Sequence, residues 1–265
     1  VNGLVVLSDA ETGVVEAVLD AGSVTALRTG AAAVLAAETL GAPGAAAAVI
    51  GVGVNGRAAA RTFAALGRPV VVWDVDDVLN DLMRSWLAVW RSSHPELDVA
   101  YEDLRANPPH RILGVPKADY LASLDAFRLS AGYRDEVPDP AVLSWLQAHG
   151  AECRQVALTA TTLEAAPASA AWVLRHFGRW IREFAVLPAL RPGDELPLYD
   201  SNKGAWIRRQ PGPTLLVDDS PENVAAVRAS GRLALCWPRP WNDVRLSVAE
   251  TLSALTGFVR GGAVP

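Results

Sequence analysis

Two short apolar runs that each end in acidic residues limit most strictly what this chain can fold into. The runs are VVVW and TLLV, and the acids that follow them are Asp74, Asp76, Asp77, Asp218 and Asp219. Nearly continuous apolar runs of this length are typical of strands buried on both faces of a parallel sheet. Parallel strands end at a shared edge, where open α/β sheets bind their ligands. Because carboxylates at a buried strand end are unfavourable unless neutralised, and oxygen ligands suit Mg²⁺, the pattern indicates a cation site.

The second part of the chain alternates expected strands with expected helices. Further strands are predicted at 153–159, 184–188 and 233–237, and a helix is predicted over 167–181. In SPENVAAVRASG, Ser220 suits a helix N-cap and Pro221 the first helical position. Residues 80–150 have mostly helical patterns that are interrupted by prolines. This alternation predicts an α/β fold with a mostly parallel sheet.

The composition agrees with a folded, globular protein. The 265 residues are enough for a hydrophobic core, and 51% hydrophobic residues are too many for a disordered chain. The net charge of −5 argues against binding a nucleic acid polymer through bulk positive charge. We find no apolar run near 18 residues, no signal-peptide pattern and only two cysteines. We therefore expect a soluble, cytoplasmic protein that does not bind a membrane.

The first 67 residues differ in composition from the rest, since they contain no Trp. The patterns predict two short strands joined by a turn at 9–13, a helix from about residue 24 to Gly41, a buried strand at 45–51, and a helix that ends at Gly67. The strand at 70–73 then follows. This shift in composition favours two units of different origin.

A glycine pattern lies between the expected strand and the last expected helix of this first part. Gly51, Gly53 and Gly56 fit G-x-G-x-x-G in the strand–turn–helix context that dinucleotide binding requires. Glycines allow a tight turn, and the helix N-terminus offers free N–H groups to a pyrophosphate. An acid about 20 positions later would bind a ribose, and Asp74 or Asp76 lies at about that distance. The alternative is a close-packed turn that binds nothing.

The segments VNGLVVLSDAETG, TALRTGAAAVLAA and AVIGVGVNGRAA, in this order, resemble the ornithine cyclodeaminase / mu-crystallin family over about residues 1–75. This resemblance implies a partial Rossmann-like unit over residues 1–67 with NAD as its cofactor. The residues it assigns to cofactor contacts are Arg28, Thr29, Gly51, Gly53 and Gly56. The chain leaves the family's pattern after one strand–helix–strand, whereas a complete dinucleotide site needs two βαβαβ halves.

Four segments in the second part, WDVDDVLND, VALTATT, SNKGAWI and LLVDDSPENV, resemble the haloacid dehalogenase-like superfamily of phosphohydrolases. The resemblance covers about residues 70–245 and implies a hydrolase domain over 68–265 with a Rossmann-like parallel sheet. The gap between Asp74 and Thr159 is too long for a plain crossover helix. In this superfamily such an insert forms a small helical cap over the site, here at about 82–140. DVDDVLND in front of the insert looks most like the 5′-nucleotidase subgroup.

The superfamily resemblance also implies roles for single residues. Asp74 would attack phosphorus and form an aspartyl-phosphate, and Asp76 would act as general acid and then as general base. Mg²⁺ would bind the Asp74 carboxylate, the Asp76 backbone carbonyl, Asp218 and a phosphate oxygen. Asp219 would complete this metal site by positioning Lys203 or a metal-bound water. The remaining phosphoryl oxygens would be held by Thr159, in VALT, and by Lys203, which we place in a loop.

Substrate contacts are expected from the cap and from the residue after Thr159. The candidates are Trp86, Trp90, Phe127, Arg128, Tyr133 and Ala160. For Trp86 and Trp90 the alternative is a place in the cap core, because aromatic residues at i and i+4 usually pack inside.

The leading hypothesis is a Mg²⁺-dependent phosphatase acting on a small phosphomonoester, with nucleotides among the candidates. One alternative is an NAD-binding or regulatory module with a vestigial hydrolase site, and another is a non-catalytic interaction protein assembled through the Ala-rich first unit. The sequence does not name the substrate, and it leaves open whether the chain forms a homo-oligomer.

Overall fold

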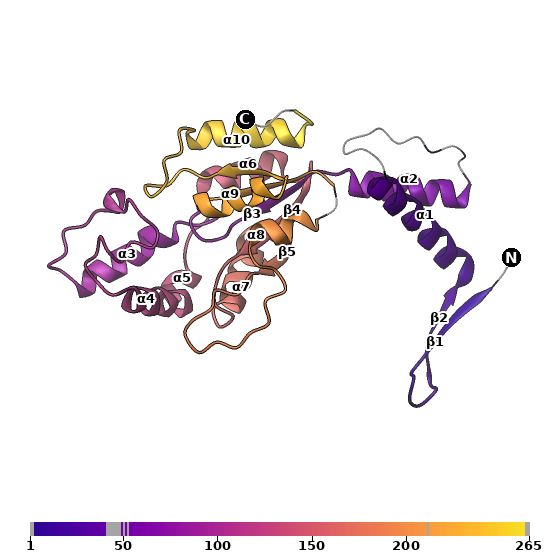
Figure 1. The fold of residues 1–265 in the computed structure, drawn as a ribbon, viewed down its shortest axis with the longest axis horizontal. Helices are drawn as coiled ribbons and strands as arrows, with labels where there is room; N and C mark the ends of the chain where they lie inside the picture. The colour runs from indigo at the N-terminus through magenta and orange to yellow at the C-terminus, as the bar shows by residue number, and fades with distance from the viewer. Residues whose placement is uncertain (1–2, 41–48, 50, 52, 211, 263–265) are drawn as a thin grey trace. The chain divides into compact units, whose positions relative to one another are not determined.

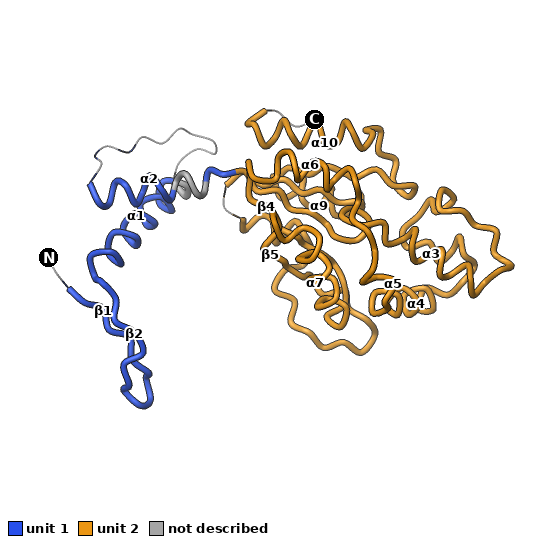
Figure 2. Tube along the Cα trace, turned by 180° about the vertical axis from the view of Figure 1, so that it is seen from behind, with its two compact units in different colours: residues 1–68 blue, residues 69–265 orange. Residues whose placement is uncertain are grey.

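The computed structural model describes residues 3–40, 49, 51, 53–210 and 212–262. The chain divides into two compact units, Val1–Arg68 and Pro69–Pro265, which Figure 2 shows in different colours. Each unit is described by itself below.

The first unit contains a hairpin and two helices. The antiparallel strands β1 (Leu4–Ser8) and β2 (Val15–Asp20) are joined by a turn in which Asp9 Oδ1 accepts a hydrogen bond from the Thr12 amide (2.7 Å). The helices are α1 (Ala21–Leu40) and α2 (Val54–Leu66). The hairpin and both helices were predicted, whereas most of the buried strand predicted at 45–51 lies outside the described residues.

The second unit is built on a five-stranded parallel sheet, drawn in Figure 1. In sheet order the strands are β5 (Ile181–Val186), β4 (Arg154–Thr159), β3 (Val70–Trp73), β6 (Thr214–Asp218) and β7 (Leu233–Cys236). Each described pair is parallel. The α/β class predicted from the sequence is confirmed, and β3 takes the central position that its fully apolar sequence favours.

The two faces of the sheet follow from the alternation of side chains along β3. Val71 and Trp73 pack in one core cluster with residues of α6 (Pro140–His149), α7 (Ala166–Phe177) and α10 (Val248–Val259). Val70 and Val72 belong to a second cluster with residues of α8 (Lys203–Arg208) and α9 (Pro221–Ala229). Because successive residues point to opposite faces, four apolar residues in a row require helices on both faces.

The insert between β3 and β4 has a hydrophobic core of its own. One of its helices, α6, packs on the sheet, and its other elements are α3 (Leu82–Ser93), a 3-10 turn (Tyr101–Asp103), α4 (Lys117–Leu129) and α5 (Ala131–Arg134). Their apolar side chains form a cluster separate from the two sheet clusters, and one residue from outside the insert, Trp241, joins it. Below, residues 82–134 are called the cap.

Three local predictions were wrong or incomplete. The helix predicted over 167–181 ends at Phe177, and the last residues of that segment lead into β5, which begins at Ile181. Lys203 begins the short helix α8 and does not lie in a loop. The helix α10 was not predicted, although Ser247 and Glu250 form a capping box at its start. Within the part of the chain that the structure describes, no helix has both the length and the apolar character needed to cross a bilayer.

Candidate phosphoryl-transfer site

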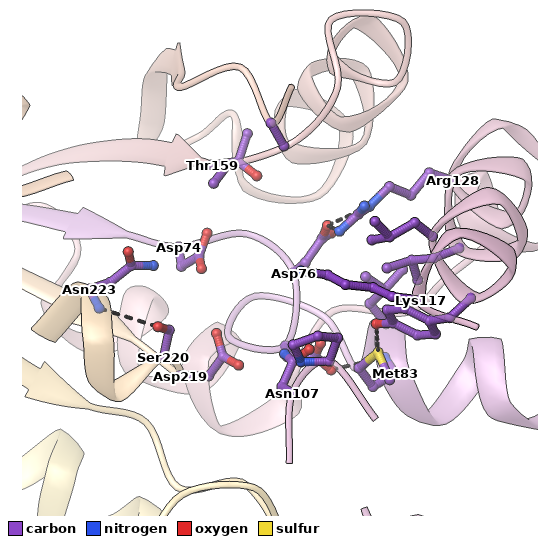
Figure 3. A pocket seen from close by; sticks show the side chains of 18 of the residues that line it. Asp74, Asp76, Met83, Asn107, Lys117, Arg128, Thr159, Asp219, Ser220 and Asn223 are labelled. Carbon is purple, nitrogen blue, oxygen red and sulfur yellow. Dashed lines mark hydrogen bonds and ion pairs between the residues drawn. The ribbon is translucent and has the colours of Figure 1, made fainter. Parts of the chain in front are cut away.

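The carboxyl ends of β3 and β6 bring three aspartates together. Trp73 is paired with Val217 in the parallel register, and the Asp74 amide continues this pairing by donating to the Val217 carbonyl (2.9 Å). The residues after these strand ends therefore lie side by side. One carboxylate oxygen from each of Asp74, Asp218 and Asp219 lies within 4.8 Å of the other two. Figure 3 shows Asp74 and Asp219 facing the same space beneath Thr159.

Lys203 is buried between two of these aspartates. Its Nζ lies 2.8 Å from Asp74 Oδ1 and 2.6 Å from Asp218 Oδ2, and only 1% of the residue is exposed. The Asn202 side chain caps α8 by accepting from the Ala205 amide (2.9 Å). At Gly204 a Cβ atom would lie 2.5 Å from the Ala226 carbonyl oxygen, so only glycine lets α8 approach α9 this closely. In the segment SNKG, the Asn202 cap and the close packing of α8 on α9 at Gly204 thus determine where the Lys203 ammonium lies.

Burial and charge crowding perturb the groups in this cluster. Burial raises the pKa of Asp74 well above its usual range, the Lys203 ammonium lowers it, and the Asp218 and Asp219 charges raise it further. Burial also raises the pKa of Asp219, and the Asp218 charge adds to this. Burial lowers the pKa of Lys203, but the Asp218 and Asp74 carboxylates outweigh burial and leave it above its ordinary value.

The donor set fits a hard divalent cation. Three carboxylates face one ammonium, so the fully ionised cluster carries two surplus negative charges. Asp74 Oδ2 and Asp219 Oδ1 receive no hydrogen bond from any described residue, and both belong to the side chains that face the cavity. Mg²⁺ is typically held by one or two carboxylates together with waters and substrate phosphate. Asp74, Asp218 and Asp219 are therefore the side chains that could hold it.

Asp76 lies apart from the three clustered carboxylates, because its side chain points toward the cap. Arg128 of α4 places Nε 3.0 Å and Nη2 2.9 Å from Asp76 Oδ2. The Tyr133 hydroxyl donates to Asp76 Oδ1 at 3.0 Å, and Asn80 Nδ2 lies 3.4 Å from the same oxygen. The interaction with Arg128 is visible in Figure 3. Arg128 and Tyr133, predicted as substrate contacts, are thus engaged by the predicted general acid.

The loop that carries Asp74 and Asp76 is fixed by hydrogen bonds on both sides. Asp77 has a φ of 63°, a left-handed conformation that non-glycine residues adopt infrequently. Its amide donates to Asn80 Oδ1 (2.9 Å), and its own Oδ1 accepts from the Met83 amide at the start of α3 (2.9 Å). Arg239 Nε donates to the Asp77 carbonyl at 2.6 Å. These bonds fix the backbone of the loop after β3 and so determine where Asp76 lies relative to the sheet.

A cavity of about 370 Å³ opens between the strand ends and the cap. Of the predicted site residues, it is lined by Asp74, Asp76, Asp219, Thr159, Ala160 and Arg128. Asp218 is 0% exposed and Lys203 1% exposed, and neither lines the cavity. Thr159 ends β4, which neighbours the central strand, and it lines the same cavity as Asp74.

Several predicted contacts do not line this cavity. Trp86, Trp90, Phe127 and Tyr133 belong to the hydrophobic cluster of the cap. Trp86 and Trp90 pack against each other with ring centroids 5.3 Å apart, so the core alternative holds for this pair. For Tyr133 only the hydroxyl reaches a site residue, which is Asp76.

Sequence reasoning missed several residues that surround the site. They are Asn107, Lys117, Arg191, Ser220 and Asn223, which line the cavity, and Trp241, whose Nε1 donates to Asp219 Oδ2 at 2.7 Å. Asn223 Nδ2 contacts both oxygens of Asp218 (3.1 and 3.2 Å). The sequence feature that could have indicated this contact is the position of Asn223, one helical turn after the N-cap Ser220. Nothing in the sequence around Trp241 indicated a partner 22 residues away.

The residues predicted to bind NAD all lie in the first unit. Arg28 and Thr29 are exposed on α1, and Gly51 and Gly53 are exposed ahead of α2. Gly51 has a φ of 95°, and a Cβ atom at Gly56 would lie 2.0 Å from the Gly51 carbonyl oxygen. A close-packed turn therefore already requires glycine at these two positions. Cofactor contacts by the five residues stay a prediction.

A comparison with protein families supports the resemblance of the N-terminal segment. Residues 1–81 match the sequence model of the ornithine cyclodeaminase/mu-crystallin family. The match includes β3 and ends in the loop that follows it. No curated protein matches the chain.

Solved structures with a similar fold include three of different descriptions. A protein of Thermotoga maritima, provisionally named a beta-phosphoglucomutase, is 17% identical over 71% of this chain and 98% of its own, with a TM-score of 0.48. Protein tyrosine kinase A of Mycobacterium tuberculosis is 17% identical over 68% and 88%, with a TM-score of 0.49. A haloacid dehalogenase (HAD) family hydrolase of Deinococcus radiodurans, solved with phosphate and sodium, is 17% identical over 74% and 98%, with a TM-score of 0.43.

Proposed function

We propose that the second unit is a Mg²⁺-dependent phosphatase that hydrolyses a small phosphomonoester through an aspartyl-phosphate on Asp74. The observation that carries this proposal is the place of Asp74. Its carboxylate lies 2.8 Å from the Lys203 ammonium and close to the Asp218 and Asp219 carboxylates, and it lines a cavity that Thr159 also lines. A nucleophile, a buried cation and a cation-binding carboxylate set are what transfer of a phosphoryl dianion to an anionic oxygen requires.

In the first step Asp74 would attack phosphorus and displace the alcohol oxygen of the ester. Asp74 Oδ1 is engaged by Lys203 and by the Val75 amide (2.8 Å each), which leaves Oδ2 as the attacking atom. The bond from Oδ2 to phosphorus forms as the ester P–O bond breaks. Lys203 and the Thr159 hydroxyl would stabilise the negative charge on the other phosphoryl oxygens. A bound Mg²⁺ would neutralise charge on the phosphoryl group and on the Asp74 carboxylate.

Asp76 would handle the proton in both steps. It would give a proton to the departing oxygen, and would then take one from the water that attacks phosphorus and frees Asp74. The products are the alcohol and inorganic phosphate, and both aspartates return to their starting state. Since Arg128 and Tyr133 hold the Asp76 carboxylate at the cap side of the cavity, they would orient it toward the leaving group.

The cap would select the substrate. The cavity volume of about 370 Å³ suits a small metabolite or a mononucleotide. Its cap side combines apolar residues (Met83, Leu121, Leu124) with polar ones (Asn107, Lys117). In this proposal residues 68–265 form the hydrolase domain, with a helical insert at about 82–140 that contains the cap, and residues 1–67 form a partial cyclodeaminase-like unit.

The proposal is tested with a generic aryl phosphate. Wild-type protein should release phosphate with Mg²⁺ and lose this activity in EDTA, while Asp74→Asn should be inactive under both conditions. Asp98→Asn is the matched control, because Asp98 is an exposed cap residue outside the cavity. Equal rates for wild type and Asp74→Asn would refute the proposal.

The alternative function is NAD binding by the first unit. It is favoured by the family match over residues 1–81 and by the glycine turn that opens α2. Titration of NAD followed by calorimetry tests it. Saturable binding that Gly53→Val abolishes would support the alternative, and no heat of binding at millimolar NAD would exclude it.

A further inference from the structure

The segment that follows β7, residues 237–242, contacts both loops that carry the clustered aspartates. Arg239 donates to backbone carbonyls of the first loop, with Nε 2.6 Å from the Asp77 oxygen and Nη2 3.1 Å from the Asn80 oxygen. Asn242 Nδ2 donates to the Asp219 carbonyl of the second loop at 2.7 Å. One stretch of six residues therefore spans the candidate metal site.

Trp241 connects this segment to the cap and to one carboxylate at the same time. Its ring belongs to the hydrophobic cluster of the cap and lies edge-on to Tyr101, with ring centroids 6.0 Å apart. Its Nε1 donates to Asp219 Oδ2 at 2.7 Å, and the residue is 8% exposed. Trp241 is the member of the cap cluster that comes from outside residues 82–134.

The hydrogen bond determines which oxygen of Asp219 is available. Asp219 lies close to the Asp74 and Asp218 carboxylates, and like charges at this distance repel each other. Without a donor the side chain would be free to rotate away from its neighbours. The indole N–H fixes Oδ2, so Oδ1 is left for a cation. Hydrogen-bond partners behind metal ligands orient those ligands and strongly affect metal affinity.

We propose that Trp241 is a positioning residue for Asp219, so that packing of the cap directly supports divalent-cation affinity. This inference rests on the metal site of the proposed function. It adds that the cap contributes to cation binding as well as to substrate selection. The coupling is reciprocal by thermodynamic linkage: a cation that binds the ordered Asp219 also stabilises the cap cluster that orders it.

The test compares Trp241→Phe with Trp237→Phe. Both variants lose an indole from the same segment, but Trp237 Nε1 has no hydrogen-bond partner among the described residues, so only the first variant frees Asp219. Mn²⁺ binding is measured directly by electron paramagnetic resonance without substrate. We expect Trp241→Phe to weaken binding roughly tenfold to hundredfold, and Trp237→Phe to stay within about threefold of wild type.

A second readout separates positioning from general damage. In the aryl phosphate assay, Trp241→Phe should need a higher Mg²⁺ concentration than wild type for half-maximal activity. At saturating Mg²⁺ its kcat should approach the wild-type value. If Trp241→Phe does not fold, benzothienylalanine at position 241 replaces the N–H with sulfur, keeps the ring shape and takes its place in both measurements.

The outcomes distinguish this inference from the proposed function. If Trp241→Phe binds Mn²⁺ as tightly as wild type, or if Trp237→Phe loses as much Mn²⁺ affinity as Trp241→Phe, the role of Trp241 is overturned. The proposed function is not affected by either result. Tight Mn²⁺ binding that depends on Trp241 in a protein without phosphatase activity would support this inference and overturn the proposed function. A wild-type protein that binds no Mn²⁺ would overturn both.

Discussion

Arg128 of the cap contacts one oxygen of Asp76 through two guanidinium nitrogens, with Nε and Nη2 at 3.0 and 2.9 Å from Oδ2. The two residues are 52 positions apart in the sequence. Asp76 belongs to the loop after the central strand, and Arg128 belongs to α4. The Tyr133 hydroxyl holds the other oxygen. The proposed proton donor is therefore positioned by the cap and not by the sheet that carries it.

Replacing Arg128 with Lys should impair turnover more than folding. A lysine can keep the positive charge but cannot place two donors on one oxygen, so Asp76 would lose its fixed direction. General acid–base catalysis contributes about a hundredfold to ten-thousandfold in rate, and we expect a loss of at least about tenfold in kcat with an aryl phosphate. Arg134→Lys, at an exposed cap position, is the control. Equal kcat values for the two variants would contradict the positioning role.

Tyr133→Phe should impair the same step. The variant removes one hydrogen bond to the Asp76 carboxylate and keeps the ring in the cap cluster. A hydrogen bond to a charged group is worth about 1.5–3 kcal/mol, so we expect roughly a tenfold to hundredfold lower kcat/KM.

Tyr101→Phe is the matched control for this experiment. The Tyr101 hydroxyl is buried and has no hydrogen-bond partner among the described residues, so its removal should leave kcat/KM unchanged. If both tyrosine variants lose activity to the same extent, packing in the cap and not the bond to Asp76 is responsible.

Lys203→Met should destabilise the metal-free protein strongly. The ammonium is the close counter-charge of Asp74 and Asp218, and its removal leaves buried carboxylates without compensation. Breaking a buried ion pair on one side costs about 3–5 kcal/mol of the free energy of unfolding. Urea unfolding in EDTA measures this loss, and added Mg²⁺ should restore more stability to the variant than to wild type.

Lys117→Met gives the comparison that interprets this result. Lys117 is exposed at the start of α4, so its replacement should change the unfolding free energy by no more than about 0.5 kcal/mol. Similar values for the two variants would mean that the ion pairs of Lys203 do not stabilise the fold.

The central part of the site was predictable because it is encoded in contiguous segments. VVVWD and TLLVDD each contain a buried strand and the acid at its carboxyl end, and the parallel arrangement alone brings Asp74 and Asp218 together. Continuous apolar runs of strand length can be recognised without knowledge of distant contacts. The same reasoning predicted the α/β class and the helical insert.

The connections between the cap and the site were not predictable in this way. Arg128 and Asp76, or Trp241 and Asp219, meet only after the cap has packed on itself and against the 237–242 segment. Sequence spacing carries no information about such tertiary contacts. Lys203 was predicted in a loop, whereas the Asn202 cap and the close approach at Gly204 make it the first residue of a helix.

Glu136 should make the stability of the protein depend on pH above the ordinary range of carboxylates. Burial raises its pKa to about 7 from 4.5; a contact with Ser85 lowers it, and the Asp76 and Asp81 charges raise it. Between pH 4.5 and pH 7, Glu136 keeps its proton in the folded state but has released it in the unfolded state. The free energy of unfolding therefore falls as the pH rises from 4.5 to 7, by about 3 kcal/mol in total for this group at roughly 1.4 kcal/mol per unit.

Glu136→Gln should remove this dependence, because glutamine has the shape of the protonated acid and does not titrate. Urea unfolding at pH 5 and pH 8 would show the variant matching wild type at pH 5 and exceeding it at pH 8. Glu96→Gln, at an exposed position, should keep the wild-type slope, since its charge is solvated in both states. A Glu136→Gln protein with the wild-type slope between pH 5 and pH 8 would show that Glu136 is already ionised in the folded state, and another buried acid of the site would then be responsible for the dependence.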